Sequence, residues 1–315
     1  MSNLRVIAHI KGGLGNQLFC YAAARRLALV NQAELVIDDV NGFACDVTYQ
    51  RQYSLHRFNI AGRPATAKER LEPFEWYKRK AAKFLLRVLP FERRPYLVQE
   101  GRAFAPRLLT LQLKRSVYLD GYWQSERYFK DIEKTIRGDF VITAPSDNVN
   151  RDCCEKIRCE PNAIALHVRW FKSPSTTSPY NASLSYYQRA IAFIKERVPN
   201  PHFFLFSDDV DAARQKLNLD DHTVTYITHN QGDANAYADL WLMVHCKHFI
   251  IANSTFSWWG AWLAKGDAKS DSTKPKPFNL ESSNPSKIVI TPNLNITGIT
   301  SWGFDGLIPD DWIVL

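Results

Sequence analysis

Apolar residues along this chain fall into two alternating patterns. Short runs of strand length, rich in β-branched and aromatic residues, are bounded by polar or turn-forming residues. Between them lie longer segments in which apolar residues recur every three or four positions, as in an amphipathic helix. The patterns predict strands at 4–10, 33–38, 96–100, 116–125, 162–169, 202–209, 222–228 and 248–253, and helices at 17–32, 183–198, 210–218 and 235–246.

This alternation predicts an α/β fold class. Buried parallel strands read as continuous apolar runs and are joined by crossover helices, so we expect parallel sheets covered on both faces. The stretch 138–161 is polar and follows neither pattern, and 315 residues suit two domains. We therefore expect one Rossmann-type domain at 1–155 and a second at 156–315, with a cleft between them.

The composition is typical of a soluble globular protein. Hydrophobic residues make up 45% and charged residues 23%, which argues against a disordered chain. No apolar run approaches the roughly 20 residues of a membrane span. The N-terminal segment enters a strand without a signal-peptide pattern, and the six cysteines lack zinc-ligand spacing and are interpreted as free thiols. We expect a cytoplasmic protein.

A net charge of +8 and a pI of about 9.1 point to an acidic partner. Much of the excess lies in residues 68–95, where 74–89 has the pattern of a basic amphipathic helix. Such a helix can cover the core with its apolar face, or it can lie on the anionic inner face of a membrane. A non-catalytic membrane-binding protein is therefore one alternative. We expect no nucleic-acid partner, because no binding motif for one accompanies the charge.

A glycine-rich turn, GGLGNQ, separates the first predicted strand from the first helix. Gly13 and Gly15 expose backbone N–H groups at a helix N-terminus, where a phosphate can bind. The turn almost fits the dinucleotide fingerprint, but Leu18 stands in place of the third glycine. Asp38 ends the second strand, where a ribose-binding acid would stand. An NAD(P) or flavin oxidoreductase is thus a second alternative, although it leaves the two amides of the turn unexplained.

Polar residues also end two strands in the second half of the chain. His167 and Arg169 are two positions apart on one strand and therefore point to the same side. Ligands of α/β sheets bind beyond the carboxyl ends of the strands, and an Arg there can hold phosphate oxygens; a core His with a surface Arg is the alternative. Asp208 and Asp209 end the next strand, where they can bind a metal, cap the following helix or accept hydrogen bonds from a nucleoside.

The stretch 252–264, ANSTFSWWGAWLA, follows a third buried strand. Its small polar residues precede a helix that carries three tryptophans. The first turn of a helix leaves backbone N–H groups without a partner, so these groups and the hydroxyls can bind an anion. We expect the tryptophans to anchor the helix in the core rather than to stack on a sugar.

Four segments together resemble glycosyltransferase family 11: GGLGNQLFCYAAARRLA, DGYWQSERYF at 120–129, HVR at 167–169, and ADLWLMVHCKHFIIANSTFSWWGAWL at 238–263. This family includes GDP-fucose-dependent α-1,2-fucosyltransferases, among them bacterial enzymes of surface polysaccharide synthesis. The resemblance implies a GT-B-like fold and inverting transfer of L-fucose from GDP-β-L-fucose to a galactoside. It further implies an oligosaccharide or glycolipid acceptor, no catalytic metal and no other cofactor.

The resemblance also implies which residues form the site. Arg169 would stabilise the leaving diphosphate beside the turn at 253–257, whereas His167 and an Asp at 208 or 209 would face guanosine. Asn16 and Gln17 would line the opposite wall. The implied binding residues are Gly13, Gly15, Asn16, Gln17, His167, Arg169, Asp208, Asp209, Asn253, Ser254, Thr255, Phe256 and Ser257.

One segment departs from the family pattern. The family commonly reads His-x-Arg-Arg-x-Asp, whereas Trp170 and Lys172 replace the second Arg and the Asp here. Any role of that Asp cannot be carried over, which leaves the general base unassigned, with Asp38 and Glu126 as weak candidates. The departure also admits a different donor or acceptor.

Overall fold

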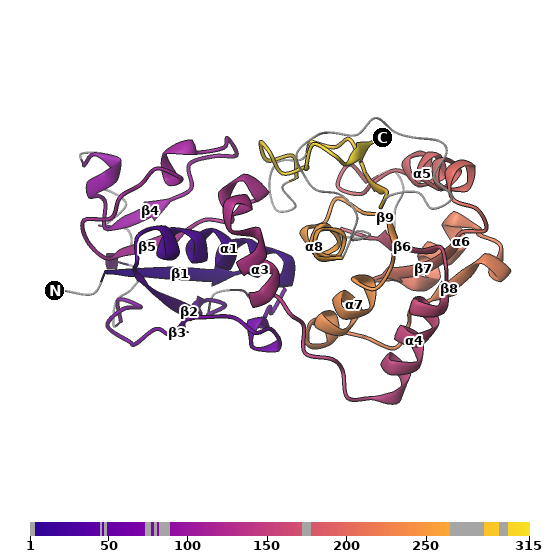
Figure 1. Cartoon of the computed structure of the whole chain (residues 1–315), viewed down its shortest axis with the longest axis horizontal. Coiled ribbons are helices and arrows are strands. Elements are labelled where there is room, and N and C mark those ends of the chain that lie inside the picture. Colours follow the sequence, from indigo (N-terminus) through magenta and orange to yellow (C-terminus); the bar gives the residue numbers. More distant parts are fainter. Residues whose placement is uncertain are drawn as a thin grey trace. The chain divides into compact units, whose positions relative to one another are not determined.

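The computed structural model describes residues 4–44, 46, 49–72, 77–78, 81, 89–171, 178–264, 287–295 and 302–315. The chain forms two compact units. Unit 1 consists of Met1–Thr143 and Gly303–Pro309, and unit 2 consists of Ala144–Trp302 and Asp310–Leu315. Each unit contains one parallel sheet with helices against it (Figure 1). The predicted α/β class is confirmed, because buried apolar strands and crossover helices leave few other arrangements.

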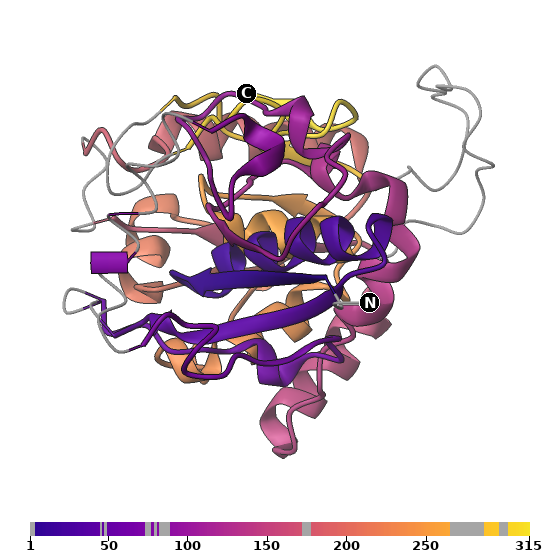
Figure 2. The same cartoon turned by 90° about the vertical axis from the view of Figure 1, so that its left-hand side faces the viewer.

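Unit 1 has a five-stranded sheet in the order β3-β2-β1-β5-β4, with all neighbouring pairs parallel. Helix α1 (Leu14–Val30) lies along one face of this sheet (Figure 2). Its alanine-rich face lets the helix approach β1 closely. The strands are β1 (Arg5–Lys11), β2 (Glu34–Gly42), β3 (Arg63–Pro64), β4 (Tyr96–Val98) and β5 (Val117–Asp120).

The other face of the unit 1 sheet carries a small aromatic and aliphatic cluster. Tyr96 stacks on Tyr118 with ring centroids 4.8 Å apart, and Ile7 and Val36 complete this layer. Side chains alternate along a strand, so this face also receives the odd-numbered residues at the end of β1. The polar chemistry of unit 1 begins where this apolar cluster ends.

Short elements complete unit 1. The 3-10 helix η4 (Glu126–Tyr128) and helix α3 (Glu133–Asp139) follow β5. The segment 303–309 returns to unit 1, where Ser125 Oγ donates a 2.7 Å hydrogen bond to the Gly306 carbonyl. Gly306 has φ +71°, and an added Cβ would lie 2.8 Å from Ser125 Oγ, so this contact requires glycine.

Unit 2 has a six-stranded parallel sheet in the order β11-β10-β9-β6-β7-β8. The strands are β6 (Ala163–Val168), β7 (His202–Ser207), β8 (Val224–Tyr226), β9 (His248–Ile250), β10 (Val289–Thr291) and β11 (Ile313–Val314). The helices are α4 (Asn148–Cys159), α5 (Leu184–Arg197), α6 (Val210–Leu217), α7 (Ala236–Met243) and α8 (Thr255–Leu263).

The faces of the unit 2 sheet are covered by different helices (Figure 1). Helices α5 and α6 join the even-numbered side chains of β6 in the main apolar core. Helices α7 and α8 pack against each other on the opposite face. An added Cβ on Gly260 of α8 would lie 2.3 Å from Met243 Sδ of α7, so the close approach of these two helices depends on glycine.

The division of the chain differs from the predicted one. Residue 155 falls inside α4, and all of this helix belongs to unit 2, which begins at Ala144. The polarity of the 138–161 stretch reflects a surface helix capped by Asp147, whose side chain accepts a hydrogen bond from Asn150 N. The return of 303–309 to unit 1 left no signal in the sequence pattern.

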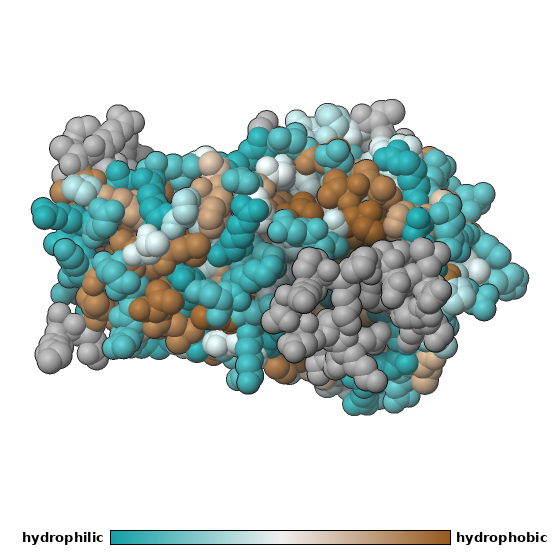
Figure 3. All heavy atoms as spheres, turned by 45° about the horizontal axis from the view of Figure 1, so that its top comes forward, coloured by the Kyte–Doolittle hydropathy of each residue, from teal (hydrophilic) through white to brown (hydrophobic). Residues whose placement is uncertain are grey.

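Most large apolar side chains of the described residues lie in the cores. The visible face is largely hydrophilic, with hydrophobic residues showing between the polar ones (Figure 3). The predicted basic helix at 74–89 lies almost entirely outside the described residues; Tyr77, within it, is 66% exposed. The membrane contact proposed for this segment therefore stays a prediction.

Candidate active site

The carboxyl edge of the unit 2 sheet gathers the polar strand ends predicted from the sequence. Strand β6 lies between β7 and β9. The chain proceeds from β6 to β7 and β8 on one side and then crosses to β9 on the other, which makes the β6/β9 junction a topological switch point. Ligands of open α/β sheets bind at such junctions. His167 and Arg169 leave β6 at this position.

His167 is a buried, neutral histidine. Its Nδ1 lies 2.8 Å from Ser257 Oγ in α8, and its carbonyl accepts a hydrogen bond from Tyr187 OH. Burial, assisted by the charge of Arg169, lowers the pKa of His167 to about 3. The imidazole therefore joins β6 to the first turn of α8 as an uncharged group.

Arg169 faces a carboxylate on the neighbouring strand. Its Nη1 lies 3.1 Å from Asp208 Oδ2, and the guanidinium lies over the Phe171 ring. About a quarter of each charged side chain remains exposed. Arg169 is thus held at the sheet edge while part of its fork stays accessible to a ligand.

The two aspartates after β7 have different roles. Asp208 accepts a hydrogen bond from Trp170 N at 3.0 Å, and burial raises its pKa although Arg169 acts in the opposite direction. Asp209 is the N-cap of α6, where its side chain accepts a hydrogen bond from Ala212 N at 2.9 Å. The capping residue is therefore Asp209, one position beyond Asp208, and only Asp208 is placed to face a ligand.

The polar turn after β9 leads into α8. Ser254 is the N-cap, and Ser257 Oγ is engaged by His167 and by the Ser254 carbonyl. Asn253 is buried and donates from Nδ2 to the Tyr180 carbonyl at 2.9 Å, whereas its Oδ1 has no hydrogen-bond partner. Thr255 and Phe256 are partly exposed in the first turn. The turn therefore presents a helix N-terminus together with an unused amide oxygen.

The glycine-rich turn of unit 1 is held by one of its own amides. Gln17 is fully buried; its Nε2 donates to the carbonyls of Gly12 and Gln52, and its Oε1 accepts from Ser54 N. The expectation that Gln17 lines a ligand wall fails, because its amide is used in bracing the turn. Asn16 remains partly exposed and accepts a 2.8 Å hydrogen bond from Gln124 Nε2.

Gly13 and Gly15 occupy the start of α1. Gly13 is the N-cap in an extended conformation, and no side chain caps the helix. An added Cβ on Gly13 would lie 3.7 Å from the guanidinium carbon of Arg51. The helix N-terminus of unit 1 therefore lies beside a cation, and both features favour a negatively charged group.

Neither weak candidate for the general base faces solvent freely. Asp38 is fully buried and accepts hydrogen bonds from the backbone N–H groups of residues 40 and 41, from Asn41 Nδ2 and from Tyr118 OH. Glu126 is buried and accepts a 2.7 Å hydrogen bond from Lys130.

A charged cluster that the sequence analysis missed lies at the ends of β1 and β5. Asp120 Oδ1 accepts hydrogen bonds from Lys11 Nζ at 2.6 Å and pairs with His9 Nδ1 at 3.0 Å, while Tyr96 OH donates to Oδ2. The signal was present in the sequence: His9-Ile10-Lys11 repeats the spacing of His167-Val168-Arg169 at the end of a strand.

Unpartnered polar atoms gather at the same edges of both sheets. Within the described part of the chain, the buried side-chain atoms without a partner are His9 Nε2, Trp123 Nε1, Gln124 Oε1, Asn253 Oδ1 and Thr291 Oγ1. Thr291 ends β10, Asn253 lies in the turn after β9, Trp123 and Gln124 lie in the turn after β5, and His9 lies two residues before the end of β1. Each such atom, left unpaired, would cost about 1–3 kcal/mol of folding free energy, so each calls for an ordered water or a bound ligand as its partner.

The profile of glycosyl transferase family 11 matches residues 5–284. The chain belongs to this family. Over 278 residues this family 11 glycosyltransferase is 31% identical to an alpha-1,2-colitosyltransferase of Escherichia coli, covering 83% of this chain and 88% of the relative. Over 314 residues it is 29% identical to the O-antigen biosynthesis glycosyltransferase WbnK of Escherichia coli, covering 91% and 99%.

The fold of this glycosyltransferase is GT-B, as the resemblance implied. The crystal structure of NodZ alpha-1,6-fucosyltransferase soaked with GDP-fucose superposes with a TM-score of 0.50 at 19% identity, covering 88% of this chain and 98% of that one. Both consist of two parallel-sheet α/β domains. The oxidoreductase and non-catalytic alternatives receive no support from family membership.

The three tryptophans of α8 are core residues in this glycosyltransferase. Trp258, Trp259 and Trp262 are at most 4% exposed, and their rings pack on one another with centroids 4.9 to 6.1 Å apart. The prediction that they anchor the helix rather than stack on a sugar is confirmed. Their rigidity fixes the turn at 253–257 against β6.

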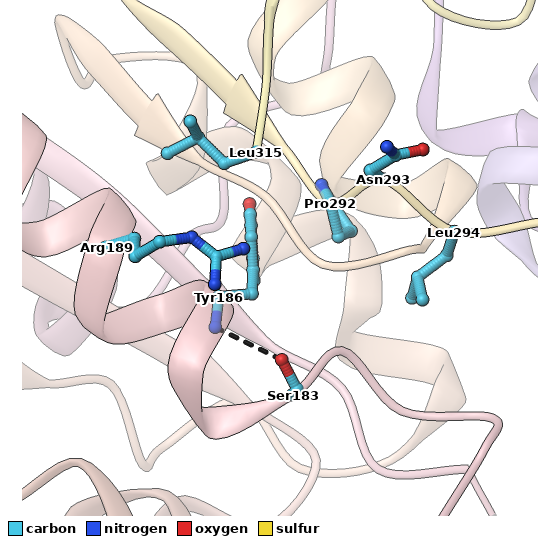
Figure 4. A pocket seen from close by; sticks show the side chains of 7 residues that line it. All are labelled: Ser183, Tyr186, Arg189, Pro292, Asn293, Leu294 and Leu315. Atoms are coloured by element: carbon cyan, nitrogen blue, oxygen red, sulfur yellow. Dashed lines mark hydrogen bonds between the residues drawn. The ribbon is translucent and has the colours of Figure 1, made fainter.

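One pocket of about 280 Å³ lies apart from the predicted site residues. It is lined by Ser183, Tyr186, Arg189, Pro292, Asn293, Leu294 and Leu315 (Figure 4). The hydroxyl of Tyr186 is occupied by the carbonyls of Ile251 and Ile290. Since Ser183 caps α5, the pocket's polar groups largely serve the fold.

The described ranges contain neither a candidate membrane span nor a candidate metal cluster. No helix there is long and apolar enough to cross a bilayer. No group of three or more His, Cys, Asp or Glu side chains in those ranges could hold a metal ion.

Proposed function

We propose that this glycosyltransferase moves L-fucose from GDP-β-L-fucose to the 2-hydroxyl of a galactoside, with inversion to an α-1,2 linkage, during synthesis of a surface polysaccharide. The observation that carries the proposal is the constellation at the β6/β9 switch point. There Arg169, the unpartnered Asn253 oxygen and the first turn of α8 lie on adjacent strand ends. The names of the relatives support a deoxyhexose donor.

Arg169 and α8 are suited to stabilise the leaving group. When the bond between C1 of the sugar and the diphosphate breaks, negative charge grows on the β-phosphate. A guanidinium fork can hold two phosphate oxygens, and the N–H groups of a helix N-terminus add fixed dipoles. Groups already oriented toward the developing charge lower the barrier most.

Asp208 is the residue proposed to recognise guanine. In the structure its carboxylate is paired with Arg169. Arrival of GDP would turn Arg169 toward phosphate and release the carboxylate to accept hydrogen bonds from N1–H and the 2-amino group of guanine. Adenine and uracil do not offer this pair of donors, so the exchange would favour GDP.

A second donor is favoured by one specific observation. The relative that is 31% identical is named a colitosyltransferase, and Trp170 with Lys172 replaces the usual family residues. Colitose is L-fucose without its 3-hydroxyl, so a GDP-linked 3,6-dideoxyhexose is the second candidate donor. Lys172 itself lies outside the described residues.

The deciding experiment is a donor panel. Purified protein is incubated with a galactoside acceptor and with GDP-fucose, GDP-colitose, GDP-mannose or UDP-galactose, and released nucleotide is measured together with the product linkage. We expect GDP release and an α-1,2 product with GDP-fucose. Turnover with GDP-colitose alone would replace the first candidate with the second, and turnover with UDP-galactose alone would overturn both.

A further inference from the structure

The charged cluster of unit 1 occupies the position that a second substrate site would take. The chain leaves β1 toward β2 on one side, whereas β5 lies on the other side, so the junction of β1 and β5 is the switch point of the unit 1 sheet. His9 and Lys11 come from β1, and Asp120 is the last residue of β5. The cluster therefore lies where ligands of such sheets bind.

The turn after β5 is strained beside this cluster. Trp123 has φ +52°, a left-handed conformation that bulky residues rarely adopt. Its Nε1 and the Oε1 of the next residue, Gln124, are both buried without partners. A donor and an acceptor held unused in one turn suit hydroxyl groups, which can both accept and donate hydrogen bonds.

The state of the His9 ring follows from its partner. Burial alone would raise the pKa of Asp120, but the hydrogen bond with His9 and the charge of Lys11 outweigh it, and the pKa lies well below its usual range. An ionised carboxylate can only accept, so His9 Nδ1 must carry the hydrogen of their 3.0 Å bond. In the neutral ring Nε2 then bears a lone pair, and this atom is buried without a partner.

We infer that His9 is the general base of the transfer reaction and that Asp120 is its positioning residue. This inference rests on the proposed glycosyl transfer. The acceptor O–H bond breaks as its proton passes to His9 Nε2, and the oxygen forms a bond to C1 of the donor sugar. The bond from C1 to the diphosphate breaks, its electron pair stays on the phosphate oxygen, and the proton later leaves His9 for solvent.

The contacts of His9 suit a general base better than those of the two carboxylates predicted from the sequence, Asp38 and Glu126. A histidine whose far nitrogen is oriented by a carboxylate is the arrangement that recurs in base-assisted reactions. Both carboxylate oxygens of Asp38 already accept hydrogen bonds, and Glu126 holds the ammonium group of Lys130. The charged or titratable groups near His9 are Lys11 on its own strand, Asp38 on β2, Tyr96 on β4, Tyr118 and Asp120 on β5, and Cys20 on α1.

The main test is His9→Gln, which keeps an amide able to donate to Asp120. A positioned general base contributes roughly 10²–10⁴-fold, so we expect kcat for transfer to fall at least about a hundredfold. The donor KM and the thermal shift given by GDP should stay at parental values. If His9 is the base, the transfer rate of the parent should fall toward acid pH, and this fall should be absent in the variant.

The matched control is His248→Gln. His248 is equally buried in a parallel strand, but it begins β9 and accepts a hydrogen bond from Ile288 N. This variant should have a changed melting temperature, but its transfer rate should still fall toward acid pH as in the parent. Asp120→Asn tests the positioning role without altering the imidazole ring. We expect a lower kcat, an unchanged donor KM, and a fall of the rate toward acid pH that begins at a different pH from the parent's.

The outcomes distinguish a failure of the base assignment from a failure of the proposed glycosyl transfer. A parent protein that transfers sugar, with His9→Gln and Asp120→Asn at parental kcat and pH profile, would overturn the assignment of the base and leave the proposed function intact. A parent that transfers nothing from any donor of the panel would overturn both. If His9→Gln fails to fold, the kcat and pH profile of Asp120→Asn decide the assignment.

Discussion

At the scale of single residues, the two charged pairs show how a cation is prepared for a ligand. Arg169 is paired with Asp208, and Lys11 is paired with Asp120. In each case the acid belongs to the strand next to the cation, so the pairing fixes the direction of the side chain across the sheet edge. Removing Lys11 would leave the buried Asp120 carboxylate with His9 and Tyr96, whereas removing Arg169 would leave the partly exposed Asp208 carboxylate without its ion pair.

Arg169→Lys should lower kcat/KM at least about a hundredfold, or about 2.7 kcal/mol of transition-state stabilisation, because an ammonium cannot reproduce the guanidinium fork. Steady-state kinetics with GDP-fucose measure the effect. Arg214→Lys is the matched control, since Arg214 also pairs with an aspartate but is exposed on α6. Lys172→Ala should cost less than about tenfold. Near-parental activity of Arg169→Lys with an inactive Lys172→Ala would place the phosphate site elsewhere.

The neutral state of His167 should make stability depend on pH. Its pKa is about 3 in the folded protein, and an unfolded histidine titrates near 6.5. The unfolded chain therefore binds the additional proton first as pH falls below 6.5, and this contribution to the free energy of unfolding declines until about pH 3. Between pH 7 and pH 5 the expected loss is about 2 kcal/mol.

Urea unfolding of the parent and of His167→Gln at both pH values measures this loss. The variant should lose about 2 kcal/mol less than the parent on acidification, whatever its stability at pH 7. His56→Gln serves as the control, because His56 is exposed. Equal pH dependence in the parent and in His167→Gln would mean that His167 is not kept neutral by folding.

At the scale of elements, periodicity predicted β1, β2, β4 to β9, α1 and α5 to α8, whose apolar runs are long or regular, but it missed β3, β10, β11, α3 and α4. The end of β5 was misplaced, since the apolar run through residue 123 conceals the left-handed backbone at Trp123. Gln17 was misassigned because a sequence does not show that its amide braces residues 12, 52 and 54. Hydrogen bonds between distant segments decide such cases, and they leave no periodic signal.

Gly260→Ala should destabilise unit 2 by about 1–2 kcal/mol, because the new methyl group would lie 2.3 Å from Met243 Sδ and either the Met243 side chain or α8 must shift to admit it. Transfer activity should also fall, since α8 carries the turn at 253–257. Gly138→Ala in α3 is the control, because no atom lies within 4 Å of its added Cβ. Thermal melting and kinetics of both variants provide the comparison; a Gly260→Ala protein as stable and active as Gly138→Ala would show that α7 and α8 adapt freely.

At the scale of the whole molecule, the two units share one arrangement of charged residues at a strand end. In each sheet a central strand ends in His-x-cation, and a neighbouring strand or its following turn supplies the acid. The sequence displays the two spacings, but their acids lie 109 and 39 residues away from the cations. Only the parallel pairing of strands brings each acid to its cation, which is why the unit 1 cluster escaped prediction.

GDP should stabilise the folded protein more than UDP or ADP does, because Asp208 is available to guanine donors. A ligand at a hundred times its Kd adds about 2.7 kcal/mol to the free energy of unfolding. Thermal shifts with the three diphosphates at equal concentration provide the measurement, with Asp208→Asn as the variant that should lose the preference. Equal shifts from all three would exclude a guanine-reading acid.

Transfer activity should persist in EDTA, because Arg169 and the N-terminus of α8 are proposed to neutralise the leaving group. The rate is compared before and after chelation, and again after addition of Mg²⁺ or Mn²⁺. Unchanged turnover in all three conditions is expected. A loss on chelation that Mg²⁺ or Mn²⁺ reverses would make Asp208 and its neighbours candidate metal ligands.

The return of residues 303–309 to unit 1 affects how the chain matures during synthesis. Translation at about 5–20 residues per second delivers residue 303 roughly 8–32 s after residue 143. Throughout that interval unit 1 lacks the segment that accepts the Ser125 hydrogen bond at Gly306. Unit 1 therefore stays incomplete while all but the last strand of unit 2 is synthesised. A fragment that ends at residue 143 would correspond to this incomplete unit and not to a finished domain.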